Sequence, residues 1–317
     1  MVLTRRTYEH IIQKFDKTNL KTNLEKTRNT QMGTFTDLQM KTTSEFALQS
    51  LHAKIAPIMD FSHSFRELED RVGAAIVVPS FTLTDAAEFN AESNNYFSGT
   101  KDVVGETINV DSHLVKSCMY TDRDVVETDV QFARDYGIGI GDCIGRAIYN
   151  KVIGLLNDVN VTNTATLAGT AKVNFADLFA TVYEKNLDIG QTVLMLTPEY
   201  FAKLLGTLDA NVYGGDEAIR GGRIAGLYGF KAVVCTPGLA SEWKGCLADI
   251  NSIGCAARYL APMVGAYVNT WQSSDPESGM PIGFREGCDL ATGYRYIAGE
   301  VLFGAKIIRP NGLVSLK

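Results

Sequence analysis

The stretch that decides the fold, Asp188–Leu239, reads DIGQTVLMLTPEYFAKLLGTLDANVYGGDEAIRGGRIAGLYGFKAVVCTPGL. Its apolar run Val193–Leu196 predicts a buried strand. The following Thr197–Glu199 (TPE) predicts a helix start, with a capping hydroxyl, a proline suited to the first turn and a carboxylate near the positive end of the helix dipole. A glycine-rich loop, Asp209–Gly222, then leads to a second strand at Phe230–Cys235. The stretch therefore predicts a mixed α and β unit in which a helix and a loop separate two strands.

The C-terminal part of the chain continues with strand patterns. Cys246–Ile250 predicts one strand, and Gly283–Arg285 and Tyr294–Ile308 predict an antiparallel pair joined at Asp289–Gly293. Pro310 is expected to end the last regular element.

The N-terminal part begins with a polar segment, residues 1–43, which is too poor in apolar residues to fold by itself. It predicts an extended arm with a little helix. From Ser44 onward, apolar residues at helical spacing predict a helix that ends near Pro57; they are Ala47, Leu51, Ile55 and Ile58.

Two β-rich segments, Val72–Phe81 and Glu106–Tyr120, flank the polar span Thr84–Gly105. This order predicts a hairpin with a long polar tip that projects from the body. A two-stranded ribbon is only marginally stable in isolation, so it needs another surface to lie upon. The hairpin therefore indicates a partner chain.

A long helix is predicted after Thr121, which with Asp124 suits an N-terminal capping box. Its apolar and glycine positions recur at steps of three and four as far as Leu155. The helix is expected to bend or loosen near Gly137–Gly141, and its glycines are also suited to admit a close backbone neighbour. The same segment does not fit the G-x-G-x-x-G template of dinucleotide loops, because Asp142 and Ile144 interrupt it.

Composition excludes several classes of protein. The 317 residues are 45% apolar and 21% charged, which allows a substantial core, and the net charge of -6 argues against a general nucleic-acid coat. No apolar run is long enough for a transmembrane helix. The six cysteines form no Cys-x-x-Cys pair, which favours reduced thiols in a cytoplasmic setting. Basic residues gather in the N-terminal arm, which is either solvated or touches a polyanion or an acidic neighbouring subunit; they include Arg5, Arg6, Lys14 and Lys17.

No catalytic constellation is recognisable, so catalytic residues, cofactors and metals are all expected to be absent. The histidines show no metal-ligand spacing and are expected to lie at the surface or to have ordinary partners; they are His10, His52, His63 and His113. Because catalytic groups are assembled by the fold, an α/β enzyme with a cleft near Gly206–Gly229 stays open as an alternative.

In the order of these elements the chain resembles the major capsid proteins of tailed bacteriophages, which have the Hong Kong 97-like fold. The resemblance covers roughly residues 45–317 and is best over 188–239 and 281–313. The second of these segments reads PIGFREGCDLATGYRYIAGEVLFGAKIIRPNGL and ends in the pattern F-G-x-K-x-x-x-P, which is typical of that family's last strand.

The resemblance implies an α+β chain with a defined order of domains. They are an N-terminal arm (1–60), an extended β-hairpin loop (61–123), a peripheral domain with a long spine helix (124–170), an axial domain (171–272) and return strands of the peripheral domain (273–317). The expected contact residues on the extended loop are Asn94, Asn95 and Lys101. Those at the tip of the axial domain are Asn211, Gly214, Gly215, Asp216 and Arg220.

The resemblance also implies a structural role. Copies of the chain would form pentamers and hexamers of an icosahedral virion capsid, assembled in the host bacterial cytoplasm around double-stranded DNA that is not bound by sequence. A separate scaffolding protein and a portal are expected partners, and no membrane is. Some members cross-link a lysine of the loop, matched here by Lys101, to an asparagine for which this sequence offers no match. A shell like that of the encapsulins, which holds cargo enzymes, is the nearest alternative.

Overall fold

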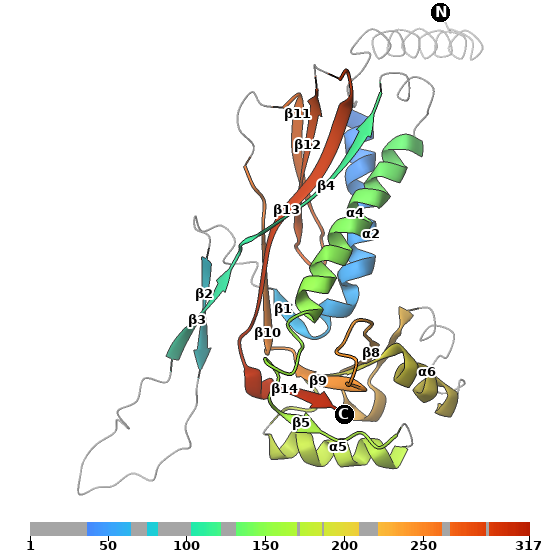
Figure 1. Cartoon of the computed structure of the whole chain (residues 1–317), viewed down its shortest axis with the longest axis vertical. Helices are drawn as coiled ribbons and strands as arrows, with labels where there is room; N and C mark the ends of the chain where they lie inside the picture. The colour runs from blue at the N-terminus through green and yellow to red at the C-terminus, as the bar shows by residue number, and fades with distance from the viewer. Residues whose placement is uncertain are drawn as a thin grey trace, which may run out of the picture.

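The computed structural model of this chain describes residues 37–64, 75–81, 103–121, 131–169, 172–185, 187–208, 221–261, 267–289 and 292–317. Figure 1 shows an elongated molecule, with a larger sheet and two long helices above and a smaller sheet with two further helices below. A narrow two-stranded ribbon stands off to one side. Helices and strands share the described residues, as the predicted α+β class requires.

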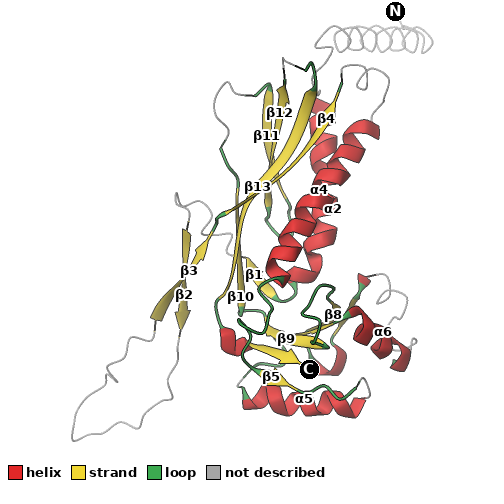
Figure 2. Ribbon diagram, in the orientation of Figure 1, coloured by secondary structure: helices red, strands yellow, loops and turns green. Residues whose placement is uncertain are grey.

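The two long helices, α2 (Asp37–Met59) and α4 (Gln131–Ile153), pack against each other and run alongside the strands of the larger sheet (Figure 2). Residues at the predicted helical spacing form the buried side of α2, namely Ala47, Leu51, Ile55 and Ile58. They meet a matching apolar side of α4, which includes Ile140, Ile144, Ile148 and Val152. The predicted helix after Ser44 is confirmed, and Pro57 lies in its last turn.

Glycines on α4 set how closely the two helices approach. A Cβ atom at Gly137 would lie 2.5 Å from the carbonyl oxygen of Thr43, and one at Gly141 would overlap the carbonyl oxygen of Ala47. The helix is continuous through this segment. The expected loosening at Gly137–Gly141 is therefore wrong, and the expected close backbone neighbour is confirmed. The predicted capping residue Asp124 lies outside the described residues.

The larger sheet has the order β1-β10-β13-β12-β11, and β4 pairs with the other edge of β13. The strands are β1 (Ser62–Ser64), β4 (Ser112–Tyr120), β10 (Ile253–Arg258), β11 (Asn269–Ser274), β12 (Pro281–Cys288) and β13 (Arg295–Ile307). The predicted antiparallel pair on either side of Asp289–Gly293 is confirmed as β12 and β13.

The smaller sheet has the order β5-β14-β9-β6-β8-β7. Its strands are β5 (Thr164–Ala165), β6 (Thr192–Leu196), β7 (Arg223–Ala225), β8 (Ala232–Cys235), β9 (Gly245–Asp249) and β14 (Leu313–Leu316). The accompanying helices are α5 (Lys172–Glu184) and α6 (Pro198–Thr207), with short turns η2 (Leu227–Gly229) and η3 (Pro310–Gly312). The predicted sequence of strand, helix and strand is confirmed as β6, α6 and the parallel β8.

Two local predictions need correction. Thr197 does precede α6, but its side chain makes no cap hydrogen bond. Its hydroxyl instead donates to the carbonyl oxygen of Lys244 at 3.1 Å. Pro310 does not end the last regular element. The chain turns there and continues as β14, which pairs with β9 in the smaller sheet.

The expected domain boundaries stay a prediction, and the pairing of the strands departs from them in several places. Within 1–60, residues 37–59 form the helix α2, which packs against α4. Within 61–123, β4 belongs to the larger sheet. Within 171–272, β10 also belongs to the larger sheet, and β11 of that sheet runs across the boundary at 272. Within 273–317, the last strand crosses to the smaller sheet. Among the described residues, no helix is both long and apolar enough to cross a membrane.

Candidate functional site

The contact residues predicted from the sequence lie outside the described residues. This applies to the loop residues Asn94, Asn95 and Lys101, to the tip residues Asn211, Gly214, Gly215, Asp216 and Arg220, and to the arm residues Arg5, Arg6, Lys14 and Lys17. Their roles stay predictions.

The described residues contain no group of three or more His, Cys, Asp or Glu side chains that could hold a metal ion. Part of the cleft expected near Gly206–Gly229 is described. There Gly221 and Arg223 line a cavity of about 260 Å³ together with His52 and Glu277. The functional features that stand out instead are two exposed apolar surfaces, one on the ribbon and one on the larger sheet.

The ribbon consists of β2 (Ala75–Phe81) and β3 (Val103–Asn109), which pair antiparallel as predicted. One face of the ribbon rests on its own chain, where Ile76 and Ile108 pack with residues of β10 and the end of β13. An ion pair of 2.8 Å between Glu106 and Lys306 Nζ joins the ribbon to β13. The base of the ribbon is therefore supported within the chain, and the tip lies outside the described residues.

The other face of the ribbon is open to solvent. Val77 is 59% exposed there. Its side chain lies beside Gly105, where a Cβ atom would come within 2.8 Å of it. The open face of the ribbon therefore exposes the apolar side chain of Val77, which no described residue of this chain covers.

The larger sheet also has an open face, because the helix pair covers only the opposite one. Side chains alternate along β4, so Cys118 and Tyr120 pack toward the helices while Met119 points away from them. Met119 is 69% exposed and stands opposite Tyr296 of β13. The ring of Tyr296 lies over Gly287 of β12.

Val268 extends this row across the next strand. Its N–H donates to the carbonyl oxygen of Glu286, which places it beside Gly287, and its side chain is 50% exposed. Tyr294, two residues before Tyr296, is exposed as well. We call these four residues the open-face row: Met119, Val268, Tyr294 and Tyr296.

The middle of the same face is closed by a buried polar network. Arg285 and Glu300 form an ion pair, and their residues are only 8% and 3% exposed. Arg285 also donates to the hydroxyl of Tyr267 at 2.9 Å and lies over its ring at 4.9 Å from the centroid. His113 Nε2 lies 3.0 Å from Glu300 Oε2, so this histidine has the ordinary partner expected of it. The face thus holds a buried ion pair in its middle and is apolar at its far end.

Sequence reasoning missed the open-face row and the buried ion pair. The alternation within SHLVKSCMY (112–120) was available as a signal for Met119, because every second residue of a strand shares a face. The pairing of Arg285 with Glu300 carries no such signal, since it depends on the register of two strands.

Comparison with known proteins shows which solved structures have a similar fold. No family model and no curated protein matches the sequence. Among solved structures, the capsid of the empty GTA particle is similar with a TM-score of 0.53 at 14% identity, over 84% of this chain and 89% of that one. The capsid of Ralstonia phage GP4 follows with 0.52 at 10% identity, over 80% and 86%. A structure from Mycobacterium phage Che8 gives 0.50 at 13% identity, over 77% and 85%. The chain therefore has the fold of tailed-phage capsid proteins, the Hong Kong 97-like fold.

Proposed function

We propose that this chain is the major capsid protein of a tailed DNA bacteriophage, a structural subunit and not an enzyme. The observation that carries the proposal is the match of at least four fifths of the chain to the capsid structures of GP4 and the GTA particle. In this proposal, copies of the chain form pentamers and hexamers of an icosahedral shell around the genome.

The exposed surfaces support a role in self-association. Large apolar side chains gathered on one face commonly mark a protein interface. The open-face row is such a surface, and Val77 adds one exposed apolar side chain on the ribbon; a symmetric assembly of identical chains would cover both. A solitary subunit would leave them in water.

The finer details belong to the same proposal. The partners are other copies of the chain, with a separate scaffolding protein and a portal, and packaged double-stranded DNA that is enclosed without sequence-specific contacts. The shell assembles in the host cytoplasm and needs no cofactor. The loop residues 94, 95 and 101 contact a neighbouring subunit, and the tip residues 211–220 meet around the symmetry axes.

Negative-stain microscopy and sedimentation of the expressed chain test the proposal. Closed particles of uniform size that contain nucleic acid are expected. Particles that enclose a cargo protein instead would favour a compartment shell of the encapsulin kind. A small, stable oligomer without large particles would contradict a shell role and would favour the enzyme with a cleft near Gly206–Gly229.

Met119→Asp is expected to lower the yield of closed particles at least about tenfold, because burying an unpaired carboxylate in an interface costs more than the 1.4 kcal/mol that corresponds to a factor of ten. Val159→Asp is the matched control, since Val159 is 86% exposed on the loop after α4, away from the open-face row. Particle yield is measured by sedimentation at equal protein concentration. Equal losses in both variants, or no loss for Met119→Asp, would remove the open-face row from the interface.

A further inference from the structure

A cavity of about 430 Å³ lies where the helix pair meets the smaller sheet, and we call it the junction cavity. The helix α2 lines it with Ala53 and Pro57, and α4 lines it with Tyr149. The loop after β8 closes it with Pro237 and Gly238. A mostly apolar cavity of this size, set between two structural units, has the dimensions and the place of a small-molecule site.

The half-buried side of the junction cavity carries polar groups without charge. The hydroxyl of Tyr149 donates to the carbonyl oxygen of Pro237 at 3.0 Å and so joins α4 to the loop after β8. The thiol of Cys235 lines the cavity near this contact. Burial raises the pKa of Tyr149 and of Cys235, so both groups are neutral near neutral pH.

The rim of the junction cavity carries two cations, Lys54 of α2 and Arg146 of α4. Both pair with Asp142, from which Lys54 Nζ lies 3.1 Å away. Burial raises the pKa of Asp142, but the hydrogen bonds and charges of the two cations lower it more, so this carboxyl is ionised near neutral pH. The stem of Lys54 packs on Gly145, where a Cβ atom would lie 2.8 Å from the Lys54 Cβ. Two fixed cations thus share one carboxylate, which leaves one positive charge at the rim.

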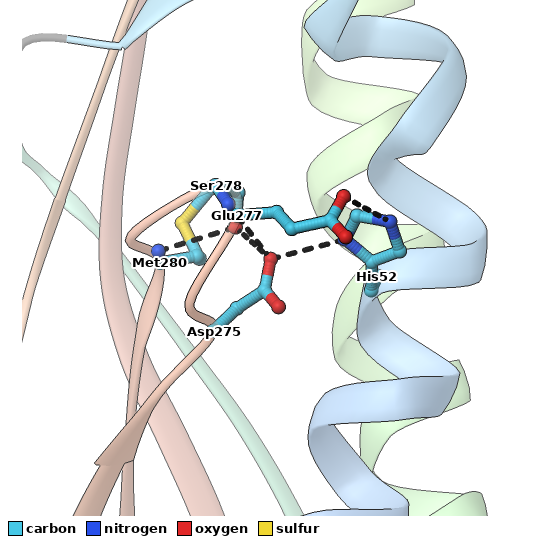
Figure 3. Close-up of polar contacts among 5 residues, drawn as sticks. All are labelled: His52, Asp275, Glu277, Ser278 and Met280. Atoms are coloured by element: carbon cyan, nitrogen blue, oxygen red, sulfur yellow. Dashed lines mark hydrogen bonds and ion pairs between the residues drawn. The ribbon is translucent and has the colours of Figure 1, made fainter.

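Two neighbouring cavities, of about 350 and 260 Å³, differ in charge because Glu277 lines both of them. Figure 3 shows Glu277 and Asp275 on either side of the ring of His52, whose Nε2 lies 3.2 Å from Glu277 Oε2 and whose Nδ1 lies 3.1 Å from Asp275 Oδ2. The described lining of the junction cavity holds no carboxylate. Of the three cavities, the junction cavity is therefore the one that favours an anion.

We propose that the junction cavity binds a small amphiphilic anion, a molecule with a compact apolar body and a single carboxylate or sulfonate group. The apolar body lies against Pro57, Tyr149 and Pro237, and the anionic group meets Lys54 and Arg146 at the rim. Since both helices and the loop after β8 line the cavity, a bound molecule ties the smaller sheet to the helix pair and stabilises the folded chain by mass action. Such binding needs only one chain, so it can be measured separately from shell assembly.

Fluorescence titration of the unassembled full chain with 8-anilinonaphthalene-1-sulfonate, an apolar dye with one sulfonate, tests the proposal. Saturable binding is expected, and Arg146→Met should weaken it about tenfold, because it removes one charge-assisted hydrogen bond. N-phenyl-1-naphthylamine, the same dye without its sulfonate, should bind the native chain and Arg146→Met about equally. Lys203→Met is the matched control, since it breaks an exposed ion pair with Glu199 on α6, outside the cavity lining, and should leave dye binding unchanged.

Two further measurements locate the dye. Ala53→Trp should abolish the binding of both dyes, because an indole at this exposed position fills the cavity. A saturating concentration of the sulfonated dye should slow the alkylation of Cys235 by iodoacetamide at least about tenfold. Alkylation of the exposed Cys288, which does not line the cavity, should keep its rate.

The absence of saturable binding, or undiminished binding in Ala53→Trp, would overturn the proposal. Equal weakening by Lys203→Met and Arg146→Met would do the same, because the rim charge would then have no special role. Loss of binding in Met119→Asp would place the dye on the open-face row and would overturn the proposal as well.

Discussion

Replacing Gly141 with alanine is expected to destabilise the folded chain by about 2–3 kcal/mol, the upper part of the range for an overpacked core. The added Cβ atom would overlap the carbonyl oxygen of Ala47, which belongs to the backbone of α2 and cannot rotate away. The two helices must then move apart, which opens the apolar contacts of Leu51 and Ile144 on either side. Urea denaturation of the unassembled chain measures the effect.

Gly139 provides the control on the same helix. A Cβ atom at Gly139 would meet nothing within 4 Å, so alanine there gains helix propensity without a clash. Gly139→Ala is expected to stabilise the chain by about 0.5–1 kcal/mol. If the two variants shifted stability in the same direction by similar amounts, close packing of α2 on α4 would not be the reason for the glycine at position 141.

These two glycines also show which structural features the sequence alone can predict. Local periodicity predicts α2 and most of α4, and the strand and helix order of 188–239, because each depends on residues close in the chain. Periodicity cannot tell whether a glycine on a helix loosens it or admits a neighbour. That answer depends on Thr43 and Ala47, which lie on a different helix.

The side-chain clusters were beyond prediction for the same reason. His52 and Asp275 are separated by 223 positions, and His113 and Glu300 by 187. No spacing in the sequence links such residues, and only the packing of α2 on the sheet and the register of β4 with β13 brings them together. The crossing of β14 into the smaller sheet is likewise a matter of tertiary pairing, which Pro310 and its turn do not reveal.

The buried ion pair of the larger sheet gives the second large effect. Arg285→Met is expected to cost about 3–5 kcal/mol, because it leaves the carboxylate of Glu300, 3% exposed, without its main counter-charge. His113 remains beside Glu300, but its side chain is 42% exposed, so it compensates only in part.

The double variant Arg285→Met with Glu300→Met separates this explanation from simple loss of packing. It removes both charges together and should recover most of the lost stability, since a buried ion pair is often no better than apolar side chains of similar size. Lys203→Met breaks the exposed pair with Glu199 on α6 and should change stability little. A double variant as unstable as Arg285→Met alone would mean that the guanidinium acts through its contacts with Tyr267 and Leu260 and not through its charge. Urea denaturation of all three variants at one pH distinguishes the two causes.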